Sequence, residues 1–200
     1  MERHRKRNVQ RIYKSILNLP KVANLHLANS MSVRYANFIN LKTAQNGIEV
    51  FANRGTSGID GSTSTAIGHS FCDDKLNILI TGDVAFFYDS NAFWQNYLGN
   101  NLRIILLNNQ GGGIFKMIAG ARDQKECKEY FVTEQNQNAR LLCEQFDLDY
   151  HFVDKREDFE QTLETFFESS SKSQILEVKT DIEINTNVLT LYRKQTQAAN

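Results

Sequence analysis

The sequence contains few cysteines, a single proline and no excess of charge of either sign. Cys72, Cys127 and Cys143 are far apart and form no Cys-x-x-Cys pair, so we expect free thiols and neither a disulfide framework nor a zinc site. The 23 basic and 23 acidic residues balance, which gives no reason to expect nucleic acid as a partner. No apolar run approaches the length of a membrane span, and the start lacks the apolar core of a signal peptide. We therefore expect a cytoplasmic protein with no membrane span.

Length and composition indicate one domain with a short extension. The chain has 200 residues, of which 41% are hydrophobic, enough for a real core. Basic residues cluster near the N-terminus, and Pro20 separates this cluster from the first strand candidate. We interpret residues 1–22 as a basic linker or the tail of a preceding domain, and residues 23–200 as the main domain.

Short unbroken apolar runs alternate with amphipathic stretches along the chain. The runs predict strands at 24–28, 48–52, 77–81, 103–107, 150–153 and 174–179. The intervening segments predict helices at 30–44, 89–98, 134–146 and 157–167, and a terminal helix within 185–200. Unbroken apolar runs suit strands that are buried on both faces. The alternation therefore predicts a doubly wound α/β fold, with a mostly parallel sheet of about six strands and helices on both faces.

Polar residues follow two of these predicted strands. Gly82 and Asp83 come directly after one strand, and Asn108 and Asn109 come after the next. Because open α/β sheets bind ligands outside the carboxyl ends of their strands, these side chains are expected to lie close together. Mg²⁺ prefers oxygen ligands, and a carbonyl in the glycine run that follows could complete the set. Each piece alone is compatible with an ordinary turn, whereas both at this spacing favour a metal site.

A second polar loop lies between a strand and a helix. Residues 53–61 read Asn-Arg-Gly-Thr-Ser-Gly-Ile-Asp-Gly. Arg54 and nearby backbone amides could bind an anion there, although a well-capped loop with one surface arginine explains the composition equally well. The four histidines show no spacing typical of a metal cluster or a catalytic triad.

The segment from Gly82-Asp83 to Asn108-Asn109 resembles the motif of thiamine diphosphate enzymes, which opens with Gly-Asp-Gly and closes with Asn-Asn. Val84 stands in place of the third glycine, a departure that some branches share. Four segments in one order are also similar to the 2-succinyl-5-enolpyruvyl-6-hydroxy-3-cyclohexene-1-carboxylate synthase family of menaquinone biosynthesis: 29–30 with Arg34, 53–61, 88–92 and 111–115. The resemblance is strong over roughly residues 25–115 and looser from there to about residue 187.

This resemblance implies a domain that binds thiamine diphosphate and Mg²⁺. The implied metal ligands are Asp83, Asn109 and the carbonyl of Gly111, and the metal would bridge to the cofactor diphosphate. The implied cofactor-binding residues are Ser57, Ile59, Gly82, Asp83, Val84, Ala85, Asn109 and Gly111. Ile59 would be the aliphatic wedge that holds the cofactor bent; on residue type alone, it would be read as a plain core residue.

The resemblance also implies two substrates, 2-oxoglutarate and isochorismate. Members of this family decarboxylate the first and add the resulting succinyl unit to the second. Both substrates carry several carboxylates, which guanidinium groups bind well. The implied substrate-binding residues are Ser30, Arg34, Arg54, Ile114 and Phe115. Residue type alone also allows a helix N-cap at Ser30, a solvated Arg34 and ordinary packing at Ile114 and Phe115.

Members of this family have three domains, and their N-terminal domain supplies the glutamate that activates the cofactor. We expect no catalytic residue in this chain, weak activity or none when it is alone, and a homo-oligomer in the complete enzyme. Two other interpretations stay open at this point. One is a portion of another thiamine diphosphate-dependent 2-oxoacid decarboxylase or synthase, such as an acetolactate-synthase-like enzyme. The other is a non-catalytic α/β assembly domain.

Overall fold

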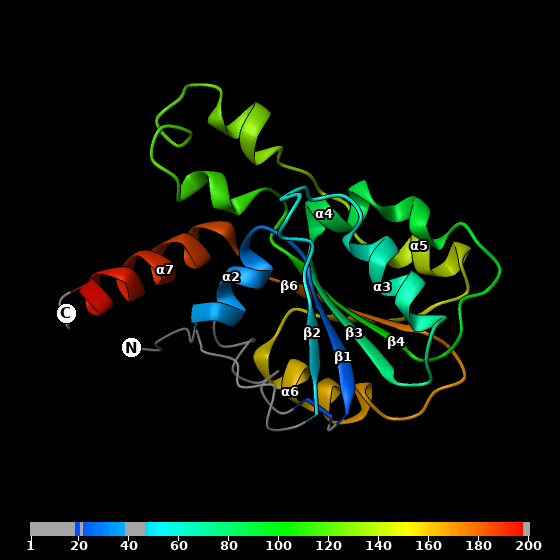
Figure 1. Ribbon diagram of the computed structural model, residues 1–200. Coiled ribbons are helices and arrows are strands. Elements are labelled where there is room, and N and C mark those ends of the chain that lie inside the picture. Colours follow the sequence, from blue (N-terminus) through cyan, green and yellow to red (C-terminus); the bar gives the residue numbers. More distant parts are fainter. Residues whose placement is uncertain (1–18, 21, 39–46, 198–200) are drawn as a thin grey trace.

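Six parallel strands form one sheet in the computed structural model, which describes residues 19–20, 22–38 and 47–197. The strands are β1 (Ala23–Leu27), β2 (Glu49–Phe51), β3 (Leu76–Gly82), β4 (Leu102–Asn108), β5 (Asp149–Val153) and β6 (Gln174–Lys179). Their order across the sheet is β2-β1-β3-β4-β6-β5, and every pairing is parallel. All carboxyl ends therefore lie along one edge, at the top of Figure 1. Each strand lies within one residue of the range predicted from the apolar runs.

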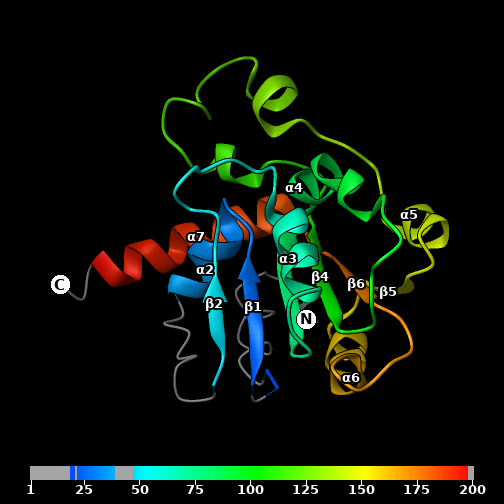
Figure 2. The same cartoon turned by 45° about the vertical axis from the view of Figure 1, so that its right-hand side comes forward.

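Helices cover both faces of this sheet (Figures 1 and 2). One face packs against α2 (Met31–Phe38), α6 (Arg156–Phe166) and α7 (Ile182–Gln197). The other packs against α3 (Ser62–Ser70), α4 (Asp83–Tyr88), the short 3₁₀ helix η2 (Ser90–Phe93) and α5 (Arg140–Gln145). The described helices include none that is long and apolar enough to cross a membrane.

Successive residues of the central strands face opposite sides of the sheet. In β3, Ile78 and Ile80 belong to the core beneath α2 and α7, whereas Leu79 belongs to the core beneath α3 and α4. All three side chains are fully buried. Because both faces of these strands are covered, most of their residues are apolar, with few buried polar exceptions such as Asn77 and Arg103, which is why the strands read as apolar runs. The prediction of a doubly wound α/β fold is confirmed.

Two of the predicted helices are wrong in their extent. The helix predicted at 89–98 is only the single 3₁₀ turn η2, because the turn after β3 leads directly into α4 at Asp83. The Asp89 carboxylate accepts hydrogen bonds from the backbone amide and the hydroxyl of Ser64, at 2.8 and 2.6 Å. It thus serves the first turn of α3 instead of starting a helix of its own. The helix predicted at 134–146 is limited to α5.

The other helices match their predictions more closely. The helix predicted at 30–44 is α2, with residues 39–46 outside the described part of the chain. The helix predicted at 157–167 is α6, shifted by one residue. The terminal helix begins at Ile182, three residues before the predicted segment, and residues 198–200 lie outside the described range. Of the predicted linker at 1–22, only residues 19, 20 and 22 are described, so that boundary stays a prediction.

One segment rises above the carboxyl ends of the strands. It runs from the 3₁₀ helix η3 (Gly113–Lys116) to the π-helix η4 (Cys127–Val132), and Figure 1 shows it as a projection above α4 and α7. We call residues 113–133 the arm. After the arm, the chain returns across the sheet edge before it enters α5. The arm therefore overhangs the place where α/β sheets bind their ligands.

Candidate functional site

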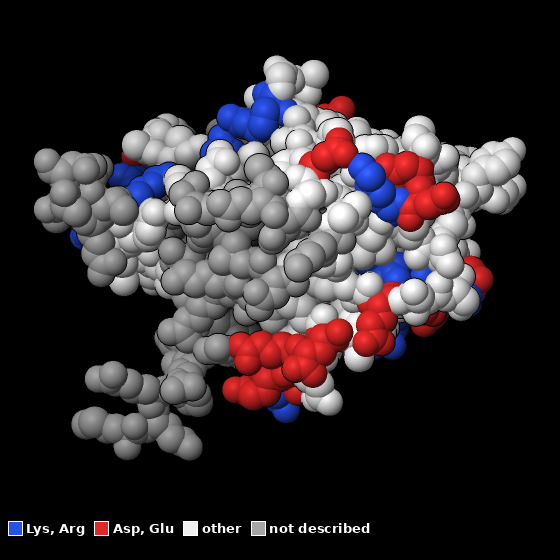
Figure 3. All heavy atoms as spheres, turned by 60° about the horizontal axis from the view of Figure 1, so that its bottom comes forward, with Lys and Arg blue, Asp and Glu red and all other residues white. Residues whose placement is uncertain are grey.

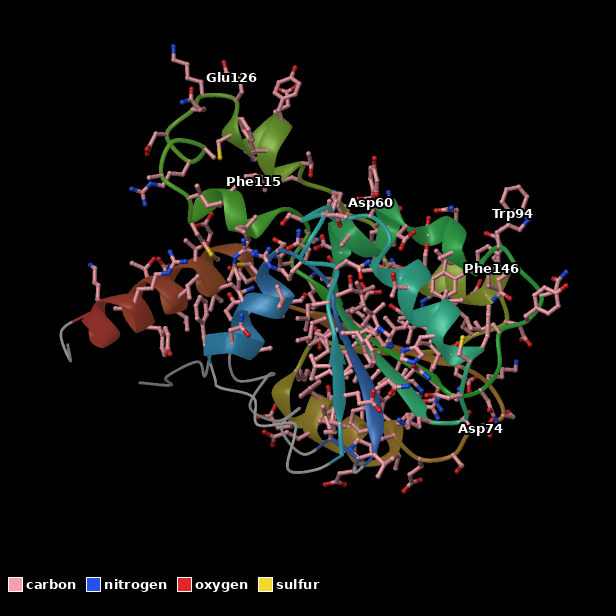
Figure 4. The ribbon with its side chains drawn as sticks, viewed as in Figure 1. Asp60, Asp74, Trp94, Phe115, Glu126 and Phe146 are labelled. Carbon is pink, nitrogen blue, oxygen red and sulfur yellow. The ribbon has the colours of Figure 1, made fainter. Side chains whose placement is uncertain are left out.

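A cavity of about 470 Å³ opens at the carboxyl ends of the strands, beneath the arm. Ten of the thirteen site residues predicted from the sequence line it: Ser30, Ile59, Gly82, Asp83, Val84, Ala85, Asn109, Gly111, Ile114 and Phe115. Ser57, Arg34 and Arg54 do not line it. Figure 4 shows Asp60 and Phe115 above this end of the sheet, whereas Asp74 lies at the opposite end. The fold thus collects residues from six separate parts of the sequence around one space: 29–35, 59, 82–88, 107–117, 130–133 and 180–185.

Asp83 is a buried carboxylate at the wall of this cavity. It begins α4 directly after β3, and only 2% of its surface is exposed. Among the described residues, those that line the cavity include no lysine or arginine. Burial raises the pKa of Asp83 to about 6, although hydrogen bonds from Gln135 and from backbone amides oppose this shift. An anionic group held in this way favours the approach of a cation from the cavity.

Three oxygen atoms converge beside Asp83. The side-chain oxygen of Asn109 lies 2.6 Å from the carbonyl oxygen of Gly111 and 3.1 Å from Oδ1 of Asp83. If the amide is rotated, its nitrogen donates to both oxygens at the same distances. The rotated amide satisfies both oxygens without a metal, whereas the orientation with the Asn109 oxygen turned inward is the one that a bound cation would favour.

The spacing of these oxygens fits Mg²⁺. Neighbouring ligands of an octahedral ion with bonds of 2.0–2.1 Å lie about 2.9 Å apart, and the separations of 2.6 and 3.1 Å fall on either side of this value. Among the described residues, no three His, Cys, Asp or Glu side chains cluster as a metal site. One carboxylate, one amide and one backbone carbonyl therefore form the donor set, which is typical of hard cations that also bind phosphate.

Two glycines allow this convergence. Gly111 has a φ of +155°, and a Cβ there would lie 2.8 Å from the carbonyl oxygen of Val132. A Cβ at Gly113 would lie 2.8 Å from the side-chain nitrogen of Asn109. A larger residue at either position would displace the arm or the metal-site amide, so these glycines permit close backbone approach.

The loop 53–61 is fastened to the sheet by Asn29, at the end of β1. The Asn29 side-chain nitrogen donates to the carbonyl oxygens of Ser57 and Gly58, the latter at 3.1 Å. Its side-chain oxygen accepts from Nη1 of Arg54 at 2.7 Å. Asn29 is 7% exposed, so these bonds are shielded from water. They fix the loop that carries Ile59 into the cavity wall.

Arg34 and Arg54 lie close enough to influence each other electrostatically. The pKa of Arg34 lies below its ordinary value, mainly because of burial and then because of the positive charges of Arg54 and Arg193. Arg34 donates to the carbonyl oxygen of Ser30, and Ser30 has a left-handed φ of 71° at the cavity wall. The two arginines therefore form a positive region beside the cavity that suits a carboxylate.

Sequence reasoning missed several residues that shape the cavity. Tyr35 of α2 lines it with 5% of its surface exposed, and burial raises its pKa to about 12. Thr180 and Asn185, at the start of α7, line the same side, and the Asn185 amide donates to the Thr180 hydroxyl at 3.2 Å. Gln135 reaches Asp83 from the segment after the arm. Nothing in the spacing of these residues signals contacts between positions so far apart in the sequence.

Comparison with known proteins gives close relatives over this chain. The family model described as thiamine pyrophosphate enzyme, C-terminal TPP binding domain, matches residues 30–178. A 2-succinyl-5-enolpyruvyl-6-hydroxy-3-cyclohexene-1-carboxylate synthase of Cytophaga hutchinsonii is 49% identical, over 93% of this chain and 33% of its own length. The proteins of the same name from Christiangramia forsetii and Flavobacterium psychrophilum are 41% and 45% identical, over 92% and 88% of this chain and 31% of their own length.

The chain therefore spans about a third of the length of the curated relatives that it matches. Among solved structures, one assigned to a thiamin diphosphate-dependent enzyme from Mycobacterium smegmatis aligns with a TM-score of 0.65. That alignment covers 88% of this chain and 32% of the other, at 18% sequence identity. At this identity the likeness shows a shared fold.

Proposed function

The chain belongs to the thiamine pyrophosphate enzyme family, as a C-terminal TPP binding domain, and on this basis we propose that it is the cofactor-binding portion of a menaquinone-pathway synthase. In this proposal, the complete enzyme decarboxylates 2-oxoglutarate and adds the succinyl unit to isochorismate. The names and identities of the curated relatives support this assignment. The resemblance recognised in the sequence is confirmed at the level of the family.

We propose that Asp83, Asn109 and the carbonyl oxygen of Gly111 hold Mg²⁺. The convergence of the Asn109 amide, the Gly111 carbonyl oxygen and Oδ1 of Asp83 beside the cavity is the observation that carries the proposal. The metal would neutralise the buried Asp83 carboxylate and bind the cofactor diphosphate on its open side. Backbone at Gly82, Val84 and Ala85 lines the same cavity and would contact the diphosphate, with Ser57 completing the proposed set.

The rest of the cavity would hold the reacting part of the cofactor. When bound, thiamine diphosphate accepts the electron pair released as a 2-oxoacid loses carbon dioxide. Ile59 lies in the cavity wall, where it would support the cofactor in a bent shape. The described residues that line the cavity include no glutamate, so we propose that the activating glutamate comes from another domain.

The substrates would bind where apolar and positive surfaces meet. Ser30, Arg34 and Arg54 would receive their carboxylates, and Ile114 and Phe115 would form the apolar wall. The Phe115 ring contacts Phe131 of the arm, with centroids 5.7 Å apart, so the arm supports this wall. We further propose that residues 23–200 form the domain, that 1–22 link it to a preceding one, and that the complete enzyme is a homo-oligomer.

Calorimetry with thiamine diphosphate tests the metal assignment on this chain. We expect binding in excess Mg²⁺ and much weaker binding when a chelator removes the metal. Asp83→Ala should remove the Mg²⁺-dependent part, because it removes the charged ligand. Asp123→Ala is the matched control, since Asp123 is an exposed arm residue whose carboxylate pairs with Arg122 at 3.4 Å. If Asp83→Ala kept Mg²⁺-dependent binding, the metal assignment would be wrong.

Nuclear magnetic resonance tests the substrate assignment. We expect 2-oxoglutarate, which has two carboxylates, to shift the guanidinium signals of Arg34 and Arg54 in the cofactor-loaded chain. Pyruvate, with one carboxylate, should shift them much less, and the exposed Arg122 should respond to neither. Equal responses to both acids would favour another thiamine diphosphate-dependent 2-oxoacid enzyme.

A further inference from the structure

Gln135 contacts one oxygen of the proposed metal-binding carboxylate. Its side-chain nitrogen lies 2.6 Å from Oδ2 of Asp83. Its side-chain oxygen accepts a hydrogen bond from the backbone amide of Gln137. An amide oxygen that accepts from a backbone N–H leaves the amide nitrogen on the other side. The direction of the Gln135 amide is therefore set by its own segment, and it must donate to Asp83.

This segment is itself anchored to a buried carboxylate in β6. Glu177 is 1% exposed and accepts from the Ala139 backbone amide at 2.8 Å and from the Tyr150 hydroxyl at 2.9 Å. It also accepts from the Asn108 side-chain nitrogen at 2.8 Å. Three hydrogen bonds to one buried carboxylate hold a segment far more firmly than an exposed loop is held. The segment that presents Gln135 is consequently fixed on the sheet.

Asn108 connects the same segment to the metal-site turn. Its side-chain nitrogen also donates to the Gln137 carbonyl at 2.9 Å, and its side-chain oxygen accepts from the Gln110 amide at 3.0 Å. Gln110 has a left-handed φ of 65° and directly precedes Gly111. One hydrogen-bonded network thus positions both the Gly111 carbonyl and the donor that contacts Asp83.

The contact decides which oxygen of Asp83 is available. Oδ2 accepts from Gln135, whereas Oδ1 lies beside the Asn109 amide, and the backbone amides of Val84 and Gly111 also donate to this carboxylate. A carboxylate with one oxygen engaged elsewhere binds a metal through the other oxygen alone. Single-oxygen ligation suits the octahedral shell of Mg²⁺, while Ca²⁺ takes six to eight ligands and accepts bidentate carboxylates readily.

We infer that Gln135 is a positioning residue that holds Asp83 as a single-oxygen ligand and thereby sets the preference of the site for Mg²⁺ over Ca²⁺. This inference rests on the proposed function, since it concerns the same metal site. Without the Gln135 donor, Asp83 can turn and offer both oxygens. The site would then lose affinity for Mg²⁺ and gain relative affinity for Ca²⁺.

The test replaces Gln135 by methionine, which has similar length and no donor. Thiamine diphosphate binding is measured by calorimetry in Mg²⁺ and, separately, in Ca²⁺. We expect Gln135→Met to weaken Mg²⁺-dependent binding about tenfold, as loss of a partner of a metal ligand typically does, and to shift the Mg²⁺/Ca²⁺ affinity ratio toward Ca²⁺. Gln161→Met is the matched control, because Gln161 has an exposed side chain on α6 and belongs to no part of this network. It should match the parent chain.

The possible results separate this inference from the proposed function. If Asp83→Ala removes metal-dependent binding but Gln135→Met keeps the parent affinity ratio, the inference fails and the proposed function stands. If Gln135→Met weakens binding equally with both metals, Gln135 is only a structural support and the inference fails. If the parent chain shows no metal-dependent binding, the proposed function and the inference fail together. Gln135→Asn, whose amide is one methylene too short to reach Asp83, should repeat the shift of Gln135→Met.

Discussion

At the amino end of the sheet, the buried Arg103 side chain is provided with acceptors by the chain itself. It is 1% exposed, and its guanidinium donates to the backbone carbonyls of Phe166 and Glu168, after α6, at 2.7 and 2.6 Å. It also donates to the carbonyls of Asn100 and Leu102. Every nitrogen of this side chain has a partner, so the group contributes to the fold and is not available for a ligand.

At the carboxyl end, the buried polar groups are arranged differently. Asp83 is almost as buried, yet it shares its surroundings with the oxygens of Asn109 and Gly111 and with a cavity. The opposite side of the molecule, beyond the amino ends of the strands, carries exposed carboxylates. Figure 3, which brings the bottom of Figure 1 forward, shows acidic side chains gathered there, on the side where α6 exposes Glu157, Asp158, Glu160 and Glu164.

The difference separates two uses of buried polarity. A group whose partners lie within the chain stabilises the fold, and its removal leaves those partners unsatisfied. A buried charge whose counter-ion comes from solution lowers the stability of the ligand-free fold, and it stabilises the fold once the ligand is bound. Substitutions at the amino end should therefore change the free energy of unfolding, whereas substitutions at the carboxyl end should change cofactor affinity.

Asp83→Asn should show the largest effect, and it should act on binding. Loss of a buried charged partner costs about 4 kcal/mol, roughly a thousandfold in affinity, so we expect Mg²⁺-dependent cofactor binding to become undetectable by calorimetry. The ligand-free chain should unfold at the same temperature or higher, since burial disfavours the Asp83 anion, as its raised pKa of about 6 indicates, and asparagine carries no charge. A clear fall in the unfolding temperature of the ligand-free chain would show that Asp83 stabilises the fold, as Arg103 does at the amino end.

Arg103→Met should have the reverse effect. Methionine keeps an apolar stem but leaves the carbonyls of Phe166 and Glu168 without their donor. We expect the free energy of unfolding to fall by about 3 kcal/mol in urea denaturation, with cofactor affinity unchanged where the variant is folded. Arg122→Met, at an exposed arginine of the arm, should leave both quantities alone. If the folded Arg103→Met variant bound the cofactor more weakly, the claim that the amino end affects stability without affecting binding would be wrong.

His26 lies between the two ends and predicts a pH dependence of stability. Its ring is 3% exposed and lies 3.2 Å from the side-chain oxygen of Asn77, and burial lowers its pKa from 6.5 to about 4. As the pH falls, the unfolded chain takes up this proton first, so stability is lost from about pH 6.5 down to about pH 4.

That loss should amount to about 3 kcal/mol, measured as the free energy of unfolding in urea at pH 7 and pH 4. His26→Gln should show a flatter pH profile than the parent chain, because glutamine binds no proton. Parallel profiles for the two chains would mean that His26 is not the group responsible.

The sheet and the metal-site residues could be predicted because both follow from short-range pattern. Strands buried on both faces are apolar at most positions, so each run marks a strand to within one residue. Asp83 and Asn109 follow neighbouring strands, and parallel pairing then brings their side chains together without further information.

Hydrogen bonds between side chains on elements far apart in the sequence could not be predicted from the apolar pattern. Asp89 was assigned to the start of its own helix, but its carboxylate binds Ser64 of α3, 25 residues earlier. Gln135 reaches Asp83 only because the chain returns across the sheet edge after the arm, 52 residues after Asp83. Neither contact produces a periodic pattern in the sequence, because each depends on how helices and loops pack in the tertiary structure.

Asn29→Ala should have the smallest effect, and it tests a polar group that both stabilises the fold and supports the cavity. Asn29 lies at the carboxyl end, yet its partners are the loop residues Arg54, Ser57 and Gly58. Its loss should lower the free energy of unfolding by about 1 kcal/mol and, because the loop that carries Ile59 is released, weaken cofactor binding roughly threefold.

Urea denaturation and calorimetry on the same Asn29→Ala preparation measure the two effects, with Asn136→Ala, at an exposed asparagine, as the control. Weaker binding without any loss of stability would make Asn29 a direct ligand contact. A loss of stability without weaker binding would mean that the position of the loop does not matter to the cofactor. A modest loss of both stability and cofactor affinity would show that Asn29 stabilises the fold and also holds the loop that lines the cavity. The carboxyl end of the sheet would then contain both kinds of buried polar group, those that stabilise the fold and those that bind the ligand.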